Sequence, residues 1–289
     1  MKGLKFVKLS IKDKLKIYLL PNLLKRLLRI GIFNVLEYKG IQIIVLKKKI
    51  LIVKSDGIFN EVTIDRGSRP LKKGISILDD KLYYGDYWRN PDRVPAYIYE
   101  VDLNSFEKKI FLALDWVRHI HFVQVDRYQK DCLLIGTGDS DSESGIYRLN
   151  VKTKEFEVLG QGAQKYRAVS IKQTKTQLLY GSDDPDGENY IYAYNKVSGV
   201  VKVLKKIEGP AYYSTVDKNG YIYIATTIED RKRHRAIIYQ SEDGGDSWQE
   251  HREFQKDIWP AKYFGNGVVE FVNGQEKLER LEYKLMGLK

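Results

Sequence analysis

The sequence is poor in the residues that cross-link small proteins or bind structural zinc. It holds one cysteine, Cys132, among 289 residues, so no disulfide can form within the chain and no CxxC zinc motif exists. Such low cysteine use is typical of a reducing compartment, and we expect a cytoplasmic location. The sequence also lacks P-loop, GxGxxG, HExxH and GxSxG motifs, so nucleotide binding and serine hydrolysis have no support.

Long uncharged runs are missing as well. Near the start of the chain the uncharged stretch of residues 17–24 is far shorter than the roughly 20 residues of a membrane-spanning helix. Charges interrupt every apolar run in this segment, and no small-residue cleavage site follows it, so we expect no signal peptide.

Acidic residues are scarce only in this first segment. The net charge is +11, but residues 1–31 contain nine lysines and arginines and one acid, and therefore carry +8 of it. The remaining residues are close to neutral, unlike the basic surface of a nucleic-acid-binding protein. We therefore expect no nucleic-acid partner.

Residues 1–33 are a basic leader in which residues 11–30 have the pattern of an amphipathic helix. Its leucines follow the i, i+3, i+4, i+7, i+8 spacing: Leu20, Leu23, Leu24, Leu27 and Leu28. Pro21 breaks or restarts this helix. Two interpretations are open. The helix packs on the body of the protein, or it lies on an anionic membrane surface and makes the protein membrane-peripheral.

From residue 34 onward, short β-type runs recur between turn signals. Four segments align with one another: residues 82–102, 133–150, 178–195 and 222–243. Each has an apolar strand, a Gly or Ala step, an acidic loop and an Ile-Tyr pair. Successive Ile-Tyr pairs are 48, 45 and 47 residues apart. A period in the forties with about four strands per unit is typical of propeller blades.

Fainter copies extend the repeat in both directions. Residues 50–57 (ILIVKSDG) resemble residues 237–244 (IIYQSEDG), and three short strand-like runs follow Trp259. We therefore predict an all-β chain in which residues 34–289 form a β-propeller with six blades, or alternatively five. Because an open sheet edge invites aggregation, propellers usually close with strands from both termini. Lys5–Leu9 (KFVKL) is the candidate closing strand.

Residues 241–248 (SEDGGDSW) match the Asp-box, S-x-D-x-G-x-x-W, at every defined position. The chain thereby resembles the BNR-repeat, sialidase-like propeller superfamily. In that family the box is a hairpin turn at the outer edge of a blade, so the resemblance makes Asp243 a marker of the fold rather than a catalytic residue. The Arg-Ile-Pro segment and the Tyr/Glu nucleophile pair of sialidases are missing, which argues against sialidase activity itself.

A second resemblance concerns the strings RGSRPL, YYGDYWRNPDR, RHIHFVQVD and TGDSDSESGIY. They are similar to those of uncharacterised propellers associated with glycan and polysaccharide gene clusters. This resemblance implies a glycan as the ligand.

His119 and His121 are the candidate catalytic pair. They alternate on a predicted inner strand, residues 119–125, so both side chains lie on one face. Two such imidazoles could act as acid and base, hold a carboxylate or bind a divalent metal ion. No third metal ligand can be assigned by spacing, and we expect no other cofactor. The alternative is a pair of buried histidines that serve packing alone.

Acidic residues follow the second strand of each repeat and should gather at one end of the ring. The candidate catalytic carboxylates are Asp86, Asp139 and Asp183, as acid or base in glycan chemistry. The alternative is ordinary turn chemistry, because aspartate beside glycine suits tight loops. For substrate binding, arginines suit an acidic sugar. The predicted substrate contacts are Arg93, Arg118, Arg167, Tyr87, Trp88, Gln124 and Tyr190.

Together these features predict a carbohydrate-active propeller that acts on an acidic oligosaccharide or polysaccharide at the face of its central channel, as a glycoside hydrolase or a lyase. Two alternatives are a non-catalytic propeller that binds a glycan or a protein, and a scaffold that its leader docks on a membrane.

Overall fold

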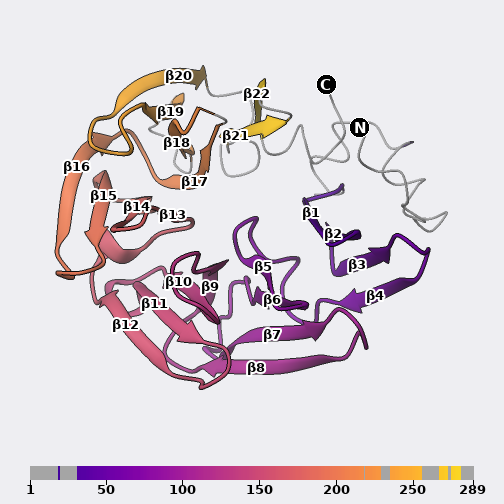
Figure 1. The fold of residues 1–289 in the computed structure, drawn as a ribbon. Coiled ribbons are helices and arrows are strands. Elements are labelled where there is room, and N and C mark those ends of the chain that lie inside the picture. Colours follow the sequence, from indigo (N-terminus) through magenta and orange to yellow (C-terminus); the bar gives the residue numbers. More distant parts are fainter. Residues whose placement is uncertain are drawn as a thin grey trace.

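The structure is a computed structural model that covers most of the repeated body (Figure 1). It describes Leu19 and residues 31–217, 219–228, 235–255, 267–272 and 275–280. The predicted leader helix, apart from Leu19, and the candidate closing strand lie outside the described residues. No helix among the described residues is long and apolar enough to cross a membrane.

Five four-stranded antiparallel sheets follow one another along the chain, and in each the strands pair in sequence order. The first contains β1 (Asn34–Tyr38), β2 (Ile41–Leu46), β3 (Lys49–Lys54) and β4 (Phe59–Thr63). The second contains β5 (Ile75–Leu78), β6 (Lys81–Gly85), β7 (Ala96–Asp102) and β8 (Lys108–Leu114). The third contains β9 (His119–Val125), β10 (Cys132–Gly138), β11 (Gly145–Asn150) and β12 (Phe156–Gln161).

The fourth sheet contains β13 (Lys172–Gln173), β14 (Gln177–Gly181), β15 (Asn189–Asn195) and β16 (Val201–Ile207). The fifth contains β17 (Ala211–Val216), β18 (Ile222–Thr226), β19 (Arg235–Ser241) and β20 (Gln249–Gln255). Beside β17 and β18 lies a two-stranded sheet of β21 (Gly267–Val272) and β22 (Gln275–Arg280).

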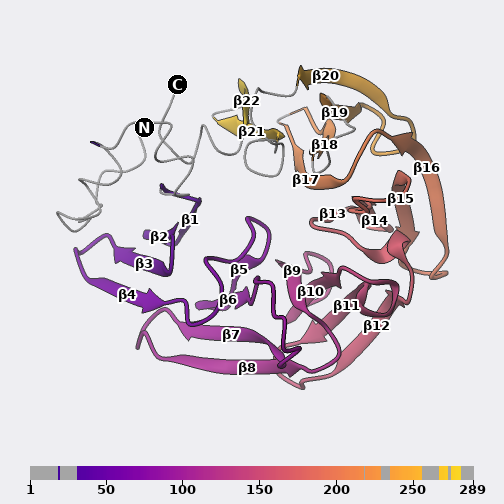
Figure 2. The same cartoon turned by 180° about the vertical axis from the view of Figure 1, so that it is seen from behind.

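The sheets are arranged as blades around a common centre, which makes the chain a β-propeller (Figure 2). Strands β5, β9, β13 and β17 lie nearest the centre, and β8, β12, β16 and β20 lie outermost. The predicted sixth unit is represented by β21 and β22. The first of the strand-like runs that follow Trp259, residues 261–264, lies outside the described residues.

The repeated Ile-Tyr pairs lie on the third strand of their blades, and each marks a β-bulge. In blades two to five the register of the third strand against the fourth shifts between the Ile and the Tyr, as at Ile98/Tyr99 and Ile146/Tyr147. A bulge adds local right-handed twist to a strand pair. The Ile-Tyr pair therefore marks the point where the outermost strand of each of these blades gains extra twist relative to the third strand.

The apolar residues of neighbouring blades form the layers between them. Leu133 and Ile135 of the third blade pack against Ile98 of the second, and all three are fully buried. The Gly or Ala position of the repeat lets neighbouring blades approach closely. At Gly85, a Cβ would lie 2.6 Å from Cγ2 of Ile120 in the next blade. Burial of this apolar surface is the main force that holds the blades together.

One inner strand is shorter than its sequence suggests. We expect a strand over residues 167–171, but β13 begins at Lys172, and in the segment before it Ala168 forms an isolated bridge to Ser182. The side-chain amide of Gln124 satisfies the backbone groups of Ile171 there. It donates to the carbonyl of Ile171 and accepts the N–H of the same residue, both at 2.9 Å.

The Asp-box segment forms the turn between β19 and β20. Asp243 accepts the backbone N–H of Ser247 at 3.0 Å, and the Ser241 hydroxyl accepts the N–H of Gly245 at 2.8 Å. The indole of Trp248 donates to the carbonyl of Gly245 at 2.9 Å and packs into the layer between the fourth and fifth blades. All three side chains thus serve the turn.

Candidate functional site

The loops between the second and third strands of successive blades lie at one end of the ring, because each antiparallel blade repeats the same strand directions. Three of these loops are residues 86–95, 139–144 and 182–188. The segments that lead into β9 and β13 reach the same end. We name this end the loop face; the predicted carboxylates Asp86, Asp139 and Asp183 all follow strands that end there.

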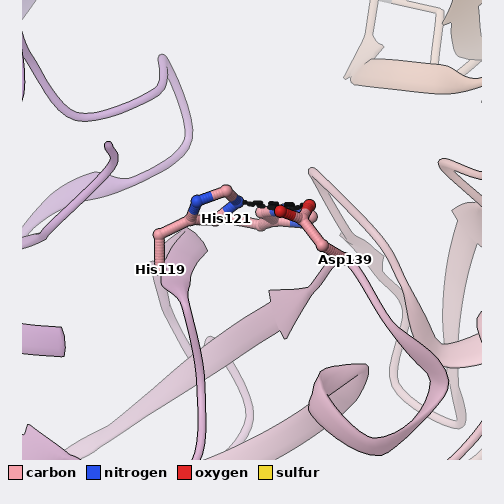
Figure 3. Close-up of side chains that lie close together, drawn as sticks. All are labelled: His119, His121 and Asp139. Atoms are coloured by element: carbon pink, nitrogen blue, oxygen red, sulfur yellow. Dashed lines mark hydrogen bonds and ion pairs between the residues drawn. The ribbon is translucent and has the colours of Figure 1, made fainter. Parts of the chain in front are cut away.

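His119 and His121 stand at the start of β9, on the loop face. The register of β9 against β10 shifts here, so that His121 is an extra residue between Ile120 and Phe122. Bulges of this kind re-aim side chains beside functional sites. The Nε2 atoms of the two imidazoles lie 3.0 Å apart (Figure 3).

Backbone carbonyls from two other blades hold the imidazoles on their far sides. Nδ1 of His119 lies 2.9 Å from the carbonyl oxygen of Trp88, and Nδ1 of His121 lies 3.2 Å from that of Ala168. A carbonyl oxygen can only accept, so we assign the proton to Nδ1 in both rings. The Nε2 edges are therefore the ones turned toward each other.

Asp139 completes the cluster from the first position after β10 (Figure 3). Its Oδ1 lies 3.3 Å from Nε2 of His119 and 3.6 Å from Nε2 of His121. Two guanidinium groups contact the same carboxylate: Nη1 of Arg118 at 2.8 Å and Nη2 of Arg167 at 3.3 Å. Arg167 also donates to the backbone carbonyl of Asp139 at 2.7 Å.

The environment sets the charge of these groups. Burial would raise the pKa of Asp139, but the approach of the His119 and His121 rings outweighs it and holds the pKa far below its usual range. Burial lowers the pKa of His121 to about 4. At neutral pH the cluster thus contains a carboxylate and a neutral His121, flanked by two guanidinium ions.

Solvent reaches the cluster from one side. His119 and His121 are buried, whereas the side chains of Asp139 and Arg118 are 20% and 37% exposed. On the buried side, Gly138 leaves room for the ring: a Cβ there would lie 2.7 Å from Cε1 of His121 and 2.8 Å from Cγ of Arg167. The cluster is therefore tightly packed around His121, and solvent reaches it at Asp139 and Arg118.

Ion pairs connect the cluster to neighbouring loops. Arg93 forms an ion pair with Glu143, which joins the loop of residues 86–95 to that of residues 139–144. Nε of Arg167 lies 3.4 Å from Oδ2 of Asp183, so Asp183 contacts the cluster through this arginine. Of the predicted residues, the structure thus brings together both histidines, Asp139, Asp183, Arg118 and Arg167.

Two aromatic residues of the loop 86–95 flank the histidines. The ring centroid of Tyr87 lies 4.5 Å from that of His119. Trp88 contributes the carbonyl that holds His119, and its indole N–H is buried without an acceptor among the described residues. Tyr87 and Trp88 therefore lie beside the histidines.

Three predicted residues lie apart from this cluster. Asp86 is buried beside Arg66, 3.6 Å from its Nη1, and accepts the backbone N–H of Tyr97. Gln124 is occupied by the backbone of Ile171, as described above. The hydroxyl of Tyr190 donates to Glu188, which also pairs with Lys206, an outer-strand residue.

Sequence reasoning missed two residues that position the cluster. Asn90 donates from Nδ2 to the carbonyls of Arg118 and Val94, at 2.8 and 2.7 Å. Gln164 donates to the carbonyl of Asp139 at 3.1 Å. The Asn-Pro pair at 90–91 is a turn signal that could have indicated Asn90. No sequence signal points to Gln164.

Comparisons with known proteins bear on the fold. A scan against protein-family models finds no match, and a search of curated proteins finds none either. Among solved structures, the tricorn protease is similar over 87% of this chain and 26% of its own, with 16% identity and a TM-score of 0.56. The extracellular domain of a putative one-component system from B. thetaiotaomicron is similar over 76% of this chain and 27% of its own, with 14% identity and a TM-score of 0.51.

A putative TolB from Agrobacterium tumefaciens is similar over 78% of each chain, with 10% identity and a TM-score of 0.52. The chain spans about a quarter of the length of the first solved chains that it resembles. At these identities the likeness concerns the fold alone. It agrees with the sheet order and the ring of blades: the chain is a β-propeller.

Proposed function

We propose that this chain is a carbohydrate-active propeller that binds an acidic glycan at the loop face and cleaves it by hydrolysis or elimination. One observation carries the proposal. Two imidazoles, a carboxylate and two guanidinium groups converge at a point that solvent can reach, within 3.6 Å of one another or of Asp139.

The proposed chemistry uses these groups in two ways. Imidazole and carboxylate side chains are the usual general acids and bases in glycan cleavage. Arg118 reaches solvent and uses one Nη1 contact for Asp139, while a guanidinium has five N–H donors in all. Nε of Arg118 is buried, but the remaining Nη donors can bind the carboxylate of a uronic or sialic-type sugar.

The aromatic residues beside the histidines support a sugar as the ligand. A tyrosine ring presents an apolar face with a polar edge, which suits the face of a pyranose. Tyr87 lies against His119, so a ring of this kind stands beside the cluster. The Asp-box turn of residues 241–248 further supports a place in the sialidase-like propeller superfamily.

A non-catalytic binding propeller is the second candidate. It is favoured by the way that Asp139 already engages both Arg118 and Arg167, and by the burial of both imidazoles. A group that is satisfied within the protein is less ready to move a proton. The same face would then recognise an acidic glycan, or an acidic protein surface, without cleaving it.

A screen of acidic oligosaccharides for binding and turnover tests the proposal. We expect at least one uronate- or sialate-containing oligomer to be bound and cleaved, and we expect His119→Ala to lower turnover by about 100-fold or more. Arg118→Ala should weaken binding by about tenfold, as the loss of a charge-assisted hydrogen bond. His251→Ala, on outer strand β20, is the matched control and should behave as wild type.

The outcomes separate the two candidates. Binding that Arg118→Ala weakens, without turnover of any oligomer, favours the binding propeller. No binding across the screen, or binding that neither substitution changes, contradicts both.

A further inference from the structure

We propose that His119, His121 and Asp139 bind one divalent transition-metal ion, of the kind that prefers imidazole and carboxylate ligands. Among the described residues these three form the one group of histidine, cysteine or acidic side chains whose ligand atoms converge in this way. The inference concerns an ion and can be tested without a glycan, so it does not rest on the proposed cleavage.

The distances fit a single ion better than a set of paired hydrogen bonds. Nε2 of His119, Nε2 of His121 and Oδ1 of Asp139 form a triangle with edges of 3.0, 3.3 and 3.6 Å. An ion with bonds of about 2.0–2.1 Å to nitrogen and oxygen holds tetrahedral ligand atoms about 3.3 Å apart. Three nearly equal edges leave the ion a place equally close to all three atoms.

The hydrogen bonds behind the imidazoles match those of metal-binding histidines. Both Nδ1 atoms face backbone carbonyls, of Trp88 and Ala168, and this fixes the tautomer in which Nε2 carries a lone pair. Two lone pairs therefore face each other and the Asp139 carboxylate. A positive charge between them is needed to make this arrangement stable.

Arg167 does not block the site. A carboxylate oxygen has two lone pairs, so Oδ1 of Asp139 can accept from Arg167 at 3.3 Å and still face an ion. The nearby charges nearly balance, because Asp139, Asp183 and Glu143 stand against Arg118, Arg167 and Arg93. A divalent ion would make the site cationic and would suit an anionic ligand at its open fourth position.

The rival explanation is a proton shared between the two imidazoles. A distance of 3.0 Å between the two Nε2 atoms is also an ordinary N–H···N hydrogen bond. The Asp139 carboxylate would balance the charge of that proton as it would balance part of the charge of an ion, so both explanations use its approach to the two Nε2 atoms. Metal titration separates the two explanations.

The test is calorimetric titration of the full chain with Zn²⁺, after a chelator has been used and removed by dialysis. We expect one ion per chain, and at least a tenfold loss of affinity in Asp139→Asn and in His119→Ala. Asp139→Asn keeps the shape of the side chain and serves if the histidine variants fold poorly. His251→Ala should bind zinc as wild type does.

Titration with Co²⁺ gives a second readout, because the visible absorption of bound cobalt reports nitrogen ligands in a low-coordinate site. The wild type should develop this band, and Asp139→Asn should lose it or change its shape. No zinc binding by the wild type would overturn the proposal. Binding that Asp139→Asn and His119→Ala leave unchanged would overturn it equally.

Discussion

Asp139 is the residue that links the histidines and arginines of the loop face. Its carboxylate contacts both imidazoles and two guanidinium groups, and its carbonyl accepts from Arg167 and Gln164. Two other segments of the chain, residues 118–121 and 164–167, therefore meet at Asp139. A neutral residue there would remove the counter-ion that Arg118 contacts and would leave Arg167 with Asp183 alone.

Another carboxylate of the same loop face, Asp86, has the opposite electrostatic character. Burial raises its pKa to about 6, and neither the N–H of Tyr97 nor the charge of Arg66 offsets that effect. The pKa is thus higher in the folded chain than in the unfolded one. Such a group stabilises the fold fully below its unfolded pKa, and this contribution is lost as pH rises through the folded value.

This difference predicts a pH dependence of stability. The free energy of unfolding should fall by about 2 kcal/mol between pH 4 and pH 6.5 from this group alone. Asp86→Asn should remove that part of the pH dependence, because an amide does not titrate. Its oxygen can still accept the N–H of Tyr97, so the fold should otherwise be kept. Urea denaturation at several pH values measures both chains. Parallel pH profiles for the two would contradict the assignment.

Residue patterns predicted part of the site. The alternation of His119 and His121 placed their side chains on one face, and the repeat placed Asp139 at the end of the adjoining strand. The sequence analysis also named Gln124 as a substrate contact, although its amide serves the backbone of Ile171. Sequence spacing cannot tell these cases apart, because the bulge in β9 and the contacts between blades depend on the tertiary structure.

At the scale of elements, Gln124 and Gln173 hold the third and fourth blades together. Gln173 donates to the carbonyl of Val125 at 2.8 Å and accepts the N–H of Arg127 at 2.9 Å. Gln124 makes the reciprocal pair of bonds with Ile171. Side-chain amides thus replace main-chain pairing where β13 is too short to provide it.

These bonds give a prediction about Gln124. Gln124→Ala leaves the N–H and carbonyl of Ile171 without their partner, which should lower the free energy of unfolding by about 1–3 kcal/mol. Glycan affinity should stay within about twofold of the wild type, after correction for the folded fraction. Gln129→Ala, in the exposed turn after β9, is the control. A selective loss of glycan binding without loss of stability would instead restore Gln124 to the substrate contacts.

At the scale of the whole molecule, the 45–48-residue period predicted the blades because each blade repeats the same bulge and the same contact with its neighbour. The acidic loops gather at one end for the same reason. The closure of the ring could not be read from the period, and the candidate closing strand Lys5–Leu9 lies outside the described residues.

The basic leader supports a prediction about membranes. If residues 11–30 lie on an anionic surface, the intact chain should float with vesicles rich in phosphatidylserine. Replacing Lys25, Arg26 and Arg29 with Gln should then weaken binding by about 100-fold, at about 1 kcal/mol for each charge. If the wild type and the variant float equally, or if neither floats, the result supports a helix packed on the propeller.

The most direct test of the central claim is hydrogen exchange of the full chain with and without the acidic oligosaccharides. The account predicts slower exchange on binding in the loops of residues 86–95, 139–144 and 182–188, which line the loop face. The turns of residues 126–131 and 174–176, at the opposite end of the ring, should not change. Protection confined to those turns, or protection nowhere, would contradict a glycan site at the loop face.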